Sequence, residues 1–182
     1  MRSYYPVNLS LEDKRCLVIG AGIVAERKVR RLLESGARVL VIGPDTTPGL
    51  MELHKKKKIV FKNRKFFLRD ISGAYLVIAA TNDRKANSAI YSYCRKNGIL
   101  VNVVDSPGEC SFILPSVVRR GALTISISTD GVSPSLSKKI RQDLEKIFGA
   151  EYAALLHIMK KMRPQVMKKI KGMRSRKDFF QK

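Results

Sequence analysis

The sequence predicts an α/β protein with a doubly wound parallel sheet, followed by a small α+β segment and a C-terminal helical segment. Three observations lead to this fold class. Between residues 15 and 105, short apolar runs alternate with helical patterns, which is typical of a parallel sheet covered by helices. A glycine-rich turn joins the first apolar run to the first helix. After Asp105, apolar and polar residues alternate strictly, as in a half-buried strand.

The glycine-rich turn has the pattern G-x-G-x-x-A and follows the apolar run 17–19 directly. Gly20 permits a tight turn from strand to helix, and Gly22 lets the backbone approach a pyrophosphate. Ala25 is small enough for the helix to pack closely on the strand, and the helix N-terminus faces the phosphates. The pattern predicts a dinucleotide site in a Rossmann-like fold, although glycine-rich turns also occur without a ligand.

The rest of the sheet follows in order along the chain. Further strands are expected at 39–42, 59–61, 75–80 and 100–104, and helices at 23–35, 49–56 and 85–96. Thr47 and Pro48 predict the N-cap and first residue of the second helix. The first helix is expected to direct these apolar residues toward the sheet: Val24, Val29, Leu32 and Leu33.

Ligands of doubly wound sheets bind beyond the carboxyl ends of the strands. We therefore expect one edge of the sheet to carry the residues that follow four of the strands, namely Gly20, Gly43, Thr81 and Asp105.

The second half of the chain predicts a hairpin and two helices. The segments 112–114 and 123–128 would form the hairpin, with its turn at 119–121, and its apolar face would contact a second chain or extend the first. Ser133 and Pro134 start a helix with one apolar face, made of Leu136, Ile140, Leu144 and Ile147. In the next helix, 151–162, an apolar stripe suggests core packing, and Pro164 is expected to break or kink it: the stripe is Tyr152, Leu155, Leu156, Met159 and Met162.

These patterns divide the chain into three parts. Residues 1–111 are expected to form the dinucleotide-binding domain, 112–149 a dimerisation segment, and 150–182 a basic helical segment. The net charge of +21 attracts polyanions, although a lysine-rich solvated surface accounts for such a charge equally well.

Composition also bears on the compartment. No apolar run approaches the ~18 residues of a membrane helix, and the N-terminus lacks an apolar signal region. The three cysteines, Cys16, Cys94 and Cys110, are odd in number and show no metal-binding spacing. The sequence therefore predicts a soluble cytoplasmic protein with reduced thiols and no metal site.

Two carboxylates are candidates for chemistry at the strand ends. Asp45 could hold the ribose hydroxyls, which favours NAD over NADP, but four nearby cations leave the opposite preference open, and a plain turn aspartate is the alternative. Asp105 could move a proton during hydride transfer, or it could cap the turn that follows. His54 and His157 stand outside these patterns, so neither is expected to be catalytic.

Five separated motifs carry a family resemblance: GAGIVAERK at 20–28, AATND at 79–83, NVVD at 102–105, SFILPS at 111–116 and STDGVSP at 128–134. Together they resemble the precorrin-2 dehydrogenase / sirohydrochlorin ferrochelatase family, the oxidase-chelatase module of sirohaem synthase. The resemblance covers about residues 4–148.

The resemblance implies NAD-dependent oxidation of precorrin-2 to sirohydrochlorin by a homodimer and, in bifunctional members, insertion of Fe²⁺ as a substrate to give sirohaem. The family's shared aspartate falls on Asp105, and its cofactor contacts fall on Ile23, Val24, Pro44 and Asp45. A serine that is phosphorylated in some relatives falls on Thr129, which departs from that pattern. The family's fused methyltransferase domain is not expected, since the sequence stops at Lys182.

Two other hypotheses remain open at this stage. The chain could be a dehydrogenase alone, with a separate chelatase completing the pathway. It could also be a non-catalytic regulator that binds NAD and a polyanion. Nucleic acid is not expected as a partner because no helix-turn-helix or RNA-binding signature is present. Precorrin-2 itself carries eight carboxylates, which suit a basic protein.

Overall fold

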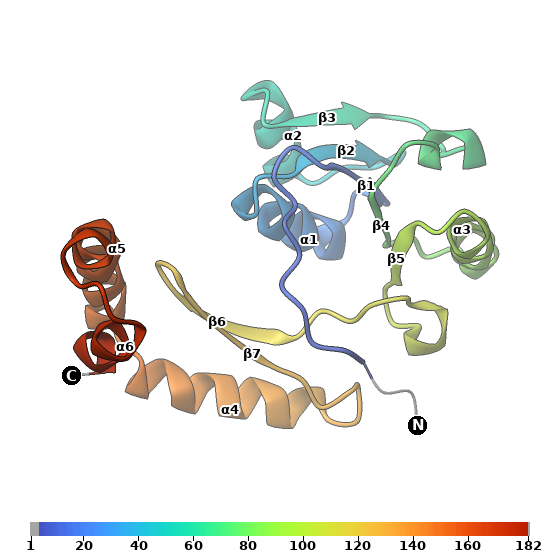
Figure 1. The fold of residues 1–182 in the computed structure, drawn as a ribbon. Coiled ribbons are helices and arrows are strands. Elements are labelled where there is room, and N and C mark those ends of the chain that lie inside the picture. Colours follow the sequence, from blue (N-terminus) through green and yellow to red (C-terminus); the bar gives the residue numbers. More distant parts are fainter. Residues whose placement is uncertain (1–3, 182) are drawn as a thin grey trace. The chain divides into compact units, whose positions relative to one another are not determined.

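The computed structural model describes residues 4–181 and divides into two compact units, with the boundary between Ile113 and Leu114 (Figure 1). The first residues of the expected domain 1–111 and the last residue of the basic segment, Lys182, lie outside the described residues.

The first unit is a five-stranded parallel sheet with helices on both faces, so the predicted fold class is confirmed. Its strands lie side by side in the order β3-β2-β1-β4-β5 (Figure 1). Their bounds are β1 Arg15–Ile19, β2 Arg38–Ile42, β3 Ile59–Lys62, β4 Leu76–Ala79 and β5 Leu100–Val103. The helices are α1 Ile23–Glu34, α2 Pro48–Lys55 and α3 Arg84–Lys96, with short 3₁₀ turns at Leu68–Ile71 and Pro107–Glu109.

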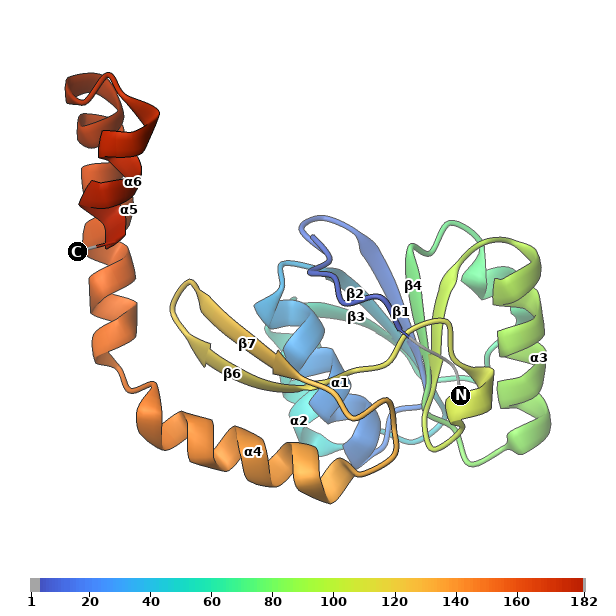
Figure 2. The ribbon, with the colours of Figure 1, turned by 60° about the horizontal axis from the view of Figure 1, so that its bottom comes forward.

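Alternate residues of β1 enter two separate cores, as expected of a strand buried on both faces. Cys16 and Val18 pack in the core beneath α1 and α2, whereas Leu17 and Ile19 pack in the core beneath α3. Figure 2 shows α3 on the opposite side of the sheet from α1. The turn that carries Gly20 therefore emerges from a strand that is held firmly on both sides.

The helix α1 covers its core through Ala25, Val29 and Leu32, which lie at helical spacing. The expected burial of Val24 is wrong, because Ala25 occupies the sheet-facing position of the first turn and leaves Val24 37% exposed. The expected cap of α2 is confirmed, since the Thr47 hydroxyl accepts a hydrogen bond from the backbone N–H of Leu50.

The two outer strands of the sheet differ in their surroundings. Along β5, the backbone N–H of Ser111 donates to the carbonyl of Val101, and the Ser111 hydroxyl accepts from the N–H of Val101. At the other edge, β3 pairs with β2 alone among the described residues, and Val60 is 55% exposed there.

The second unit consists of a hairpin and three helices. Its elements are β6 Ser116–Arg120, β7 Leu123–Ile127, α4 Pro134–Ile147, α5 Glu151–Lys169 and α6 Met173–Gln181. The predicted hairpin is present, but its first strand is not at 112–114 and its turn is not at 119–121. Pairing starts after Pro115, which lacks an N–H to donate. Arg120 still pairs with Leu123, so the turn is Gly121-Ala122.

Two expectations for the helices of this unit are corrected. The helix α5 continues through the exposed Pro164 to Lys169, so the expected break is absent, while the alternative of a kink at Pro164 stays a prediction. The expected core packing of the α5 stripe holds only in part, because Leu155 and Met162 are exposed. On α4, Leu136, Ile140 and Ile147 are also exposed within this chain.

Candidate functional site

The turn after β1 requires glycine at its first position. Gly20 has a φ of +104°, and its N–H donates to the carbonyl of Ile42 at 2.8 Å. A Cβ at Gly20 would collide with the carbonyl oxygen of Ala80 at the end of β4. The first glycine thus lets β1 turn between the ends of two neighbouring strands.

Gly22 is the N-cap of α1 and has open space before it. A Cβ at this position would meet no atom within 4 Å, and its neighbour Ile23 is 82% exposed. The first intrahelical bond runs from the N–H of Glu26 to the carbonyl of Gly22, which leaves the earlier N–H groups directed out of the helix end. Open space, exposed N–H groups and the positive helix end fit the pyrophosphate of a dinucleotide.

The loop after β2 lies against this turn. Gly43 packs against Ala21, and the N–H of Thr47 donates to the carbonyl of Ala21 at 3.2 Å. Pro44 and Asp45 are exposed in this loop. The structure therefore brings the expected ribose-side residues to the same edge of the sheet as the glycine turn.

A contact that the sequence did not predict fixes this loop to α1. The Thr47 hydroxyl donates to Oε2 of Glu26 at 2.5 Å, and Arg30 donates to Oε1 at 2.6 Å. These hydrogen bonds, the one from Thr47 first, hold the pKa of Glu26 below its usual value. A Cβ at Gly49 would collide with the Glu26 carboxylate, so the start of α2 also fits closely against Glu26.

Thr81 lies at the end of β4, where its hydroxyl is engaged within its own turn. It donates to Oδ1 of Asn87 at 2.7 Å, and the Asn87 amide donates back to the Thr81 carbonyl at 3.0 Å. Asp83 caps α3 by accepting from the N–H of Ala86 at 3.1 Å. Thr81 therefore shapes the turn beside Gly20 rather than offering a free hydroxyl.

Asp105 lies at the end of β5 in a left-handed backbone conformation, with φ +58°. Aspartate tolerates this conformation better than most residues do, and such conformations cluster at functional sites. The N–H of Val104 donates to the carbonyl of Ala79, so β5 is still paired with β4 one residue earlier. Among residues 4–181, no hydrogen bond to the Asp105 carboxylate is found, which disfavours a turn-capping role. The predicted edge with Gly20, Gly43, Thr81 and Asp105 is thus formed.

Lys28, on α1, interacts electrostatically with Asp105. Its side chain is partly buried, and this burial is the main reason why the pKa of Lys28 is lowered. Repulsion from Arg27 and Arg31 lowers the pKa of Lys28 further, while attraction to Asp105 opposes the change. From the sequence, Lys28 was only one of the four cations near Asp45, with Arg27, Arg30 and Arg38, and its interaction with Asp105 was not predicted.

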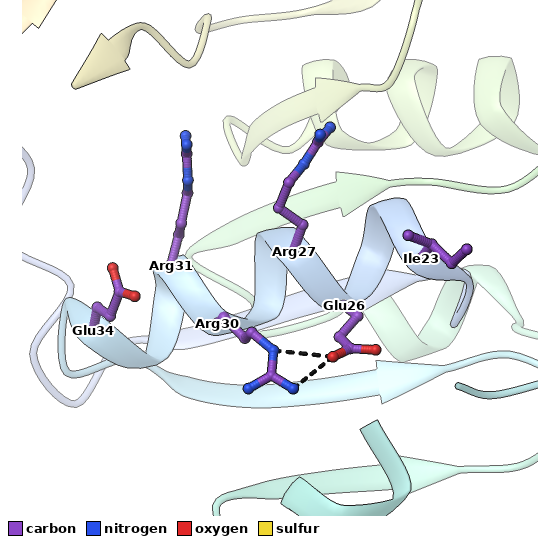
Figure 3. A pocket seen from close by; sticks show the side chains of 6 residues that line it. All are labelled: Ile23, Glu26, Arg27, Arg30, Arg31 and Glu34. Atoms are coloured by element: carbon purple, nitrogen blue, oxygen red, sulfur yellow. Dashed lines mark hydrogen bonds and ion pairs between the residues drawn. The ribbon is translucent and has the colours of Figure 1, made fainter. Parts of the chain in front are cut away.

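A shallow pocket runs along the outer surface of α1 (Figure 3). It is lined by Ile23, Glu26, Arg27, Arg30, Arg31 and Glu34. Figure 3 shows Arg27 and Arg31 extending to one side of the helix, while Arg30 turns the other way to bind Glu26. Arg27 and Arg31 are like charges four residues apart, and such a pair destabilises a helix by about 0.2–0.5 kcal/mol.

Other candidate groups lie outside this edge. Cys16 and Cys94 are buried free thiols, and desolvation raises the pKa of each to about 11. Across residues 4–181, no group of three or more His, Cys, Asp or Glu side chains is arranged to hold a metal ion. Thr129, in the turn before α4, accepts from the N–H of Ser133 and donates to its carbonyl. No helix in the described part of the chain is long and apolar enough to cross a membrane.

The fold and the glycine turn define a dinucleotide-binding protein, and comparison with known families agrees. A family model described as "Putative NAD(P)-binding" matches residues 7–116, and the chain belongs to this NAD(P)-binding family. The expectation that the first unit binds a nicotinamide dinucleotide is thereby confirmed. A second model, described as "Sirohaem biosynthesis protein central", matches residues 120–147.

Individual relatives make the placement more specific. The chain is 38% identical over 179 residues to the siroheme synthase of Nitrosococcus oceani and 36% identical to that of Methylococcus capsulatus. These matches cover 98% of this chain but only 38% of each relative. The solved structure of SirC, a precorrin-2 dehydrogenase, matches with a TM-score of 0.81 and 28% identity, over 96% of this chain and 86% of that one. The resemblance inferred from the five sequence motifs is confirmed.

Proposed function

We propose that this chain oxidises precorrin-2 to sirohydrochlorin with NAD as the hydride acceptor. The similarity to SirC over nearly the whole chain and to siroheme synthases supports this substrate. The observation that carries the proposal is the position of Asp105, whose carboxylate lies without a hydrogen-bond partner among the described residues at the edge that also carries the glycine turn.

The chain's own groups would divide the work as follows. The exposed N–H groups at the start of α1 bind the pyrophosphate, and Gly22 leaves room for it. Ile23, Val24 and Pro44 contact the rest of the dinucleotide, and Thr81 shapes the edge beside it. When bound, NAD supplies the hydride acceptor. Asp105 accepts the proton that leaves the tetrapyrrole as the hydride, with its electron pair, passes to the nicotinamide.

The preference for NAD is part of the proposal. Asp45 is exposed in the loop that is fixed to α1, where its negative charge would repel a 2′-phosphate. NAD is therefore expected to have a lower KM than NADP, and Asp45→Asn should narrow the difference. An unchanged ratio of the two KM values in Asp45→Asn would remove Asp45 from the ribose site.

We further propose that residues 1–111 bind the cofactor, 112–149 form a homodimer contact and 150–182 form a basic helical segment. The exposed apolar residues of α4, Leu136 and Ile140 among them, support a dimer because a single chain leaves them in water. The free thiols at Cys16 and Cys94 are consistent with the reducing cytoplasm. Light scattering of the purified chain measures the dimer directly, and a monomer at micromolar concentration would contradict it.

Insertion of Fe²⁺ into sirohydrochlorin is the second candidate function. The same carboxylate of Asp105 could take up the protons that leave the pyrrole nitrogens as the ion enters. Iron here is a substrate, so a resident metal site is not needed. An anaerobic assay with sirohydrochlorin and Fe²⁺, read by absorbance, tests this activity separately from the oxidation.

The central experiment follows NADH formation from precorrin-2 under anaerobic conditions. Asp105→Asn keeps the size of the side chain and tolerates the left-handed backbone, so it isolates the loss of the base. Turnover should fall by about 10²–10⁴-fold, the range of general-base catalysis. Asp13→Asn is the matched control, because Asp13 also has a positive φ but lies before β1, at the opposite edge.

The outcomes separate the hypotheses. Full turnover in Asp105→Asn would refute the proton-transfer role. Wild-type protein that binds NAD but never forms NADH from precorrin-2 would instead favour the regulator, and retention on DNA at physiological salt would support it further.

A further inference from the structure

Arg27, Lys28 and Arg31 lie close together on α1, and in the described part of the chain no ion pair joins any of them to a carboxylate. Arg30 pairs with Glu26 and Arg64 pairs with Asp70, whereas within residues 4–181 no carboxylate oxygen lies within ion-pair distance of Arg27 or Arg31. Figure 3 shows these two arginines extending side by side from one face of the helix. Lys28 lies between them in sequence and is partly buried.

This arrangement is unfavourable in the protein by itself. Arg27 and Arg31 are four residues apart, and both repel the charge on Lys28, which burial already disfavours. Attraction from Asp105 offsets part of the repulsion on Lys28. A bound anion with several negative charges would relieve the repulsion among all three cations at once.

The position of the three residues on the helix indicates which anion they would meet. The pyrophosphate of a dinucleotide lies at the helix N-terminus, before Gly22. At a rise of about 1.5 Å per residue, Arg27 lies about 7 Å and Arg31 about 13 Å further along the axis. The cofactor phosphates are therefore poorly placed for Arg31, while Lys28 is near the carboxylate proposed to react.

We propose that Arg27, Lys28 and Arg31 form a carboxylate-binding face that holds acidic side chains of the tetrapyrrole and places its ring system beside Asp105. This inference rests on the proposed function and deepens it by assigning residues to the substrate. Guanidinium groups bind carboxylates through paired, charge-assisted hydrogen bonds, and the substrate presents eight carboxylates. Glu34 also lines the pocket along α1, beyond Arg31. Its negative charge would repel a carboxylate, so the face ends there.

The test separates substrate binding from cofactor binding. Arg27→Gln, Lys28→Gln and Arg31→Gln are each assayed for the KM of precorrin-2, the KM of NAD and kcat. Each should raise the KM of precorrin-2 by roughly tenfold, the factor that 1.4 kcal/mol produces, with the KM of NAD unchanged. Lys96→Gln removes one positive charge from an exposed position at the end of α3, away from the proposed face and from the cofactor loop, so it serves as the matched control.

A second measurement does not depend on turnover. Uroporphyrin, a stable tetrapyrrole with eight carboxylates, is titrated into wild-type protein without NAD and followed by its fluorescence. The affinity of the wild-type protein for uroporphyrin should fall steeply as salt is added. At low salt, Arg27→Gln and Arg31→Gln should each bind uroporphyrin more weakly than the wild type. Without ligand, the variants should unfold at the wild-type temperature or slightly above it, because each substitution removes part of the repulsion among the three cations.

Two outcomes would count against the face. A rise in the KM of NAD alone would assign the three cations to the cofactor phosphates. Equal effects of Lys96→Gln and Arg31→Gln would show a general effect of net charge. If wild-type protein fails to oxidise precorrin-2 yet binds uroporphyrin through these residues, the proposed function fails while the binding face stands.

Discussion

The two glycines of the β1–α1 turn should respond in opposite ways to the addition of one methyl group. Gly20→Ala places a Cβ against the carbonyl oxygen of Ala80 and forces a non-glycine residue to a φ of +104°. A sparsely populated backbone conformation costs about 1–3 kcal/mol and overpacking about 1–3 kcal/mol, so the variant should lose about 2–6 kcal/mol of stability. That is a large share of the roughly 5–15 kcal/mol that stabilises a domain.

Gly22→Ala should leave the free protein almost unchanged. The φ of Gly22 is −80°, and the added Cβ meets nothing within 4 Å. The reduced entropy of the unfolded chain favours alanine by about 0.4–1 kcal/mol, and the weaker N-cap disfavours it by a similar amount. The same Cβ points into the space assigned to the pyrophosphate, so the Kd for NAD should rise at least tenfold.

Urea unfolding and calorimetric titration with NAD measure both effects on the same samples. Gly20→Ala should have a much lower unfolding midpoint, whereas Gly22→Ala should unfold like the wild type and bind NAD weakly. Normal NAD binding by Gly22→Ala would refute the assignment of the turn to the pyrophosphate. An unchanged midpoint for Gly20→Ala would refute the steric argument.

Three further predictions concern stability and reactivity. Thr47→Val removes the α2 cap and the bond to Glu26, so urea unfolding should show a loss of about 1–2 kcal/mol, with Thr47→Ser largely restoring it. The hydrogen bonds from Arg64 lower the pKa of Asp70 to about 2, so its contribution to stability is complete above its unfolded value of 3.8 and is lost as the pH falls toward 2. Acid unfolding of Asp70→Asn should lack that component, and an identical acid transition would contradict the ion pair. Burial raises the pKa of Cys16 to about 11, so a thiol reagent at pH 8 should label it only after unfolding, and fast labelling of the native protein would show that the core opens.

The sequence was informative where a single physical constraint decides the outcome. Continuous apolar runs such as 17–19 belong to strands with a core on each face, and parallel strands bring their carboxyl ends to one edge. Gly20 and Asp105 could therefore be placed together without knowledge of any contact. Thr47 could be assigned as a cap because its hydroxyl and the following proline act locally.

Features that depend on distant partners could not be derived in this way. Glu26 meets Thr47 across 21 positions of sequence, and periodicity indicates which face is buried but not which side chain meets it. Val24 seemed to face the sheet because it is apolar, but the smaller Ala25 holds that position. The hairpin starts later than expected because Pro115 cannot donate to a strand ladder and because Phe112 instead lies beside β5, where its carbonyl accepts from the Asn102 amide.

The open edge of the sheet gives the lysine-rich loop a role of its own. The outer edge of β3, which pairs with no further strand in the described part of the chain and carries the exposed Val60, offers backbone groups on which another chain could add a strand. Exposed lysines lie at both ends of this strand. Residues 55–58 precede it, and Lys62 is its last residue. Two such edges approaching each other would repel strongly, and this repulsion opposes aggregation. Part of the charge of +21 therefore opposes contact between the β3 edges of two chains, and this role requires no bound polyanion.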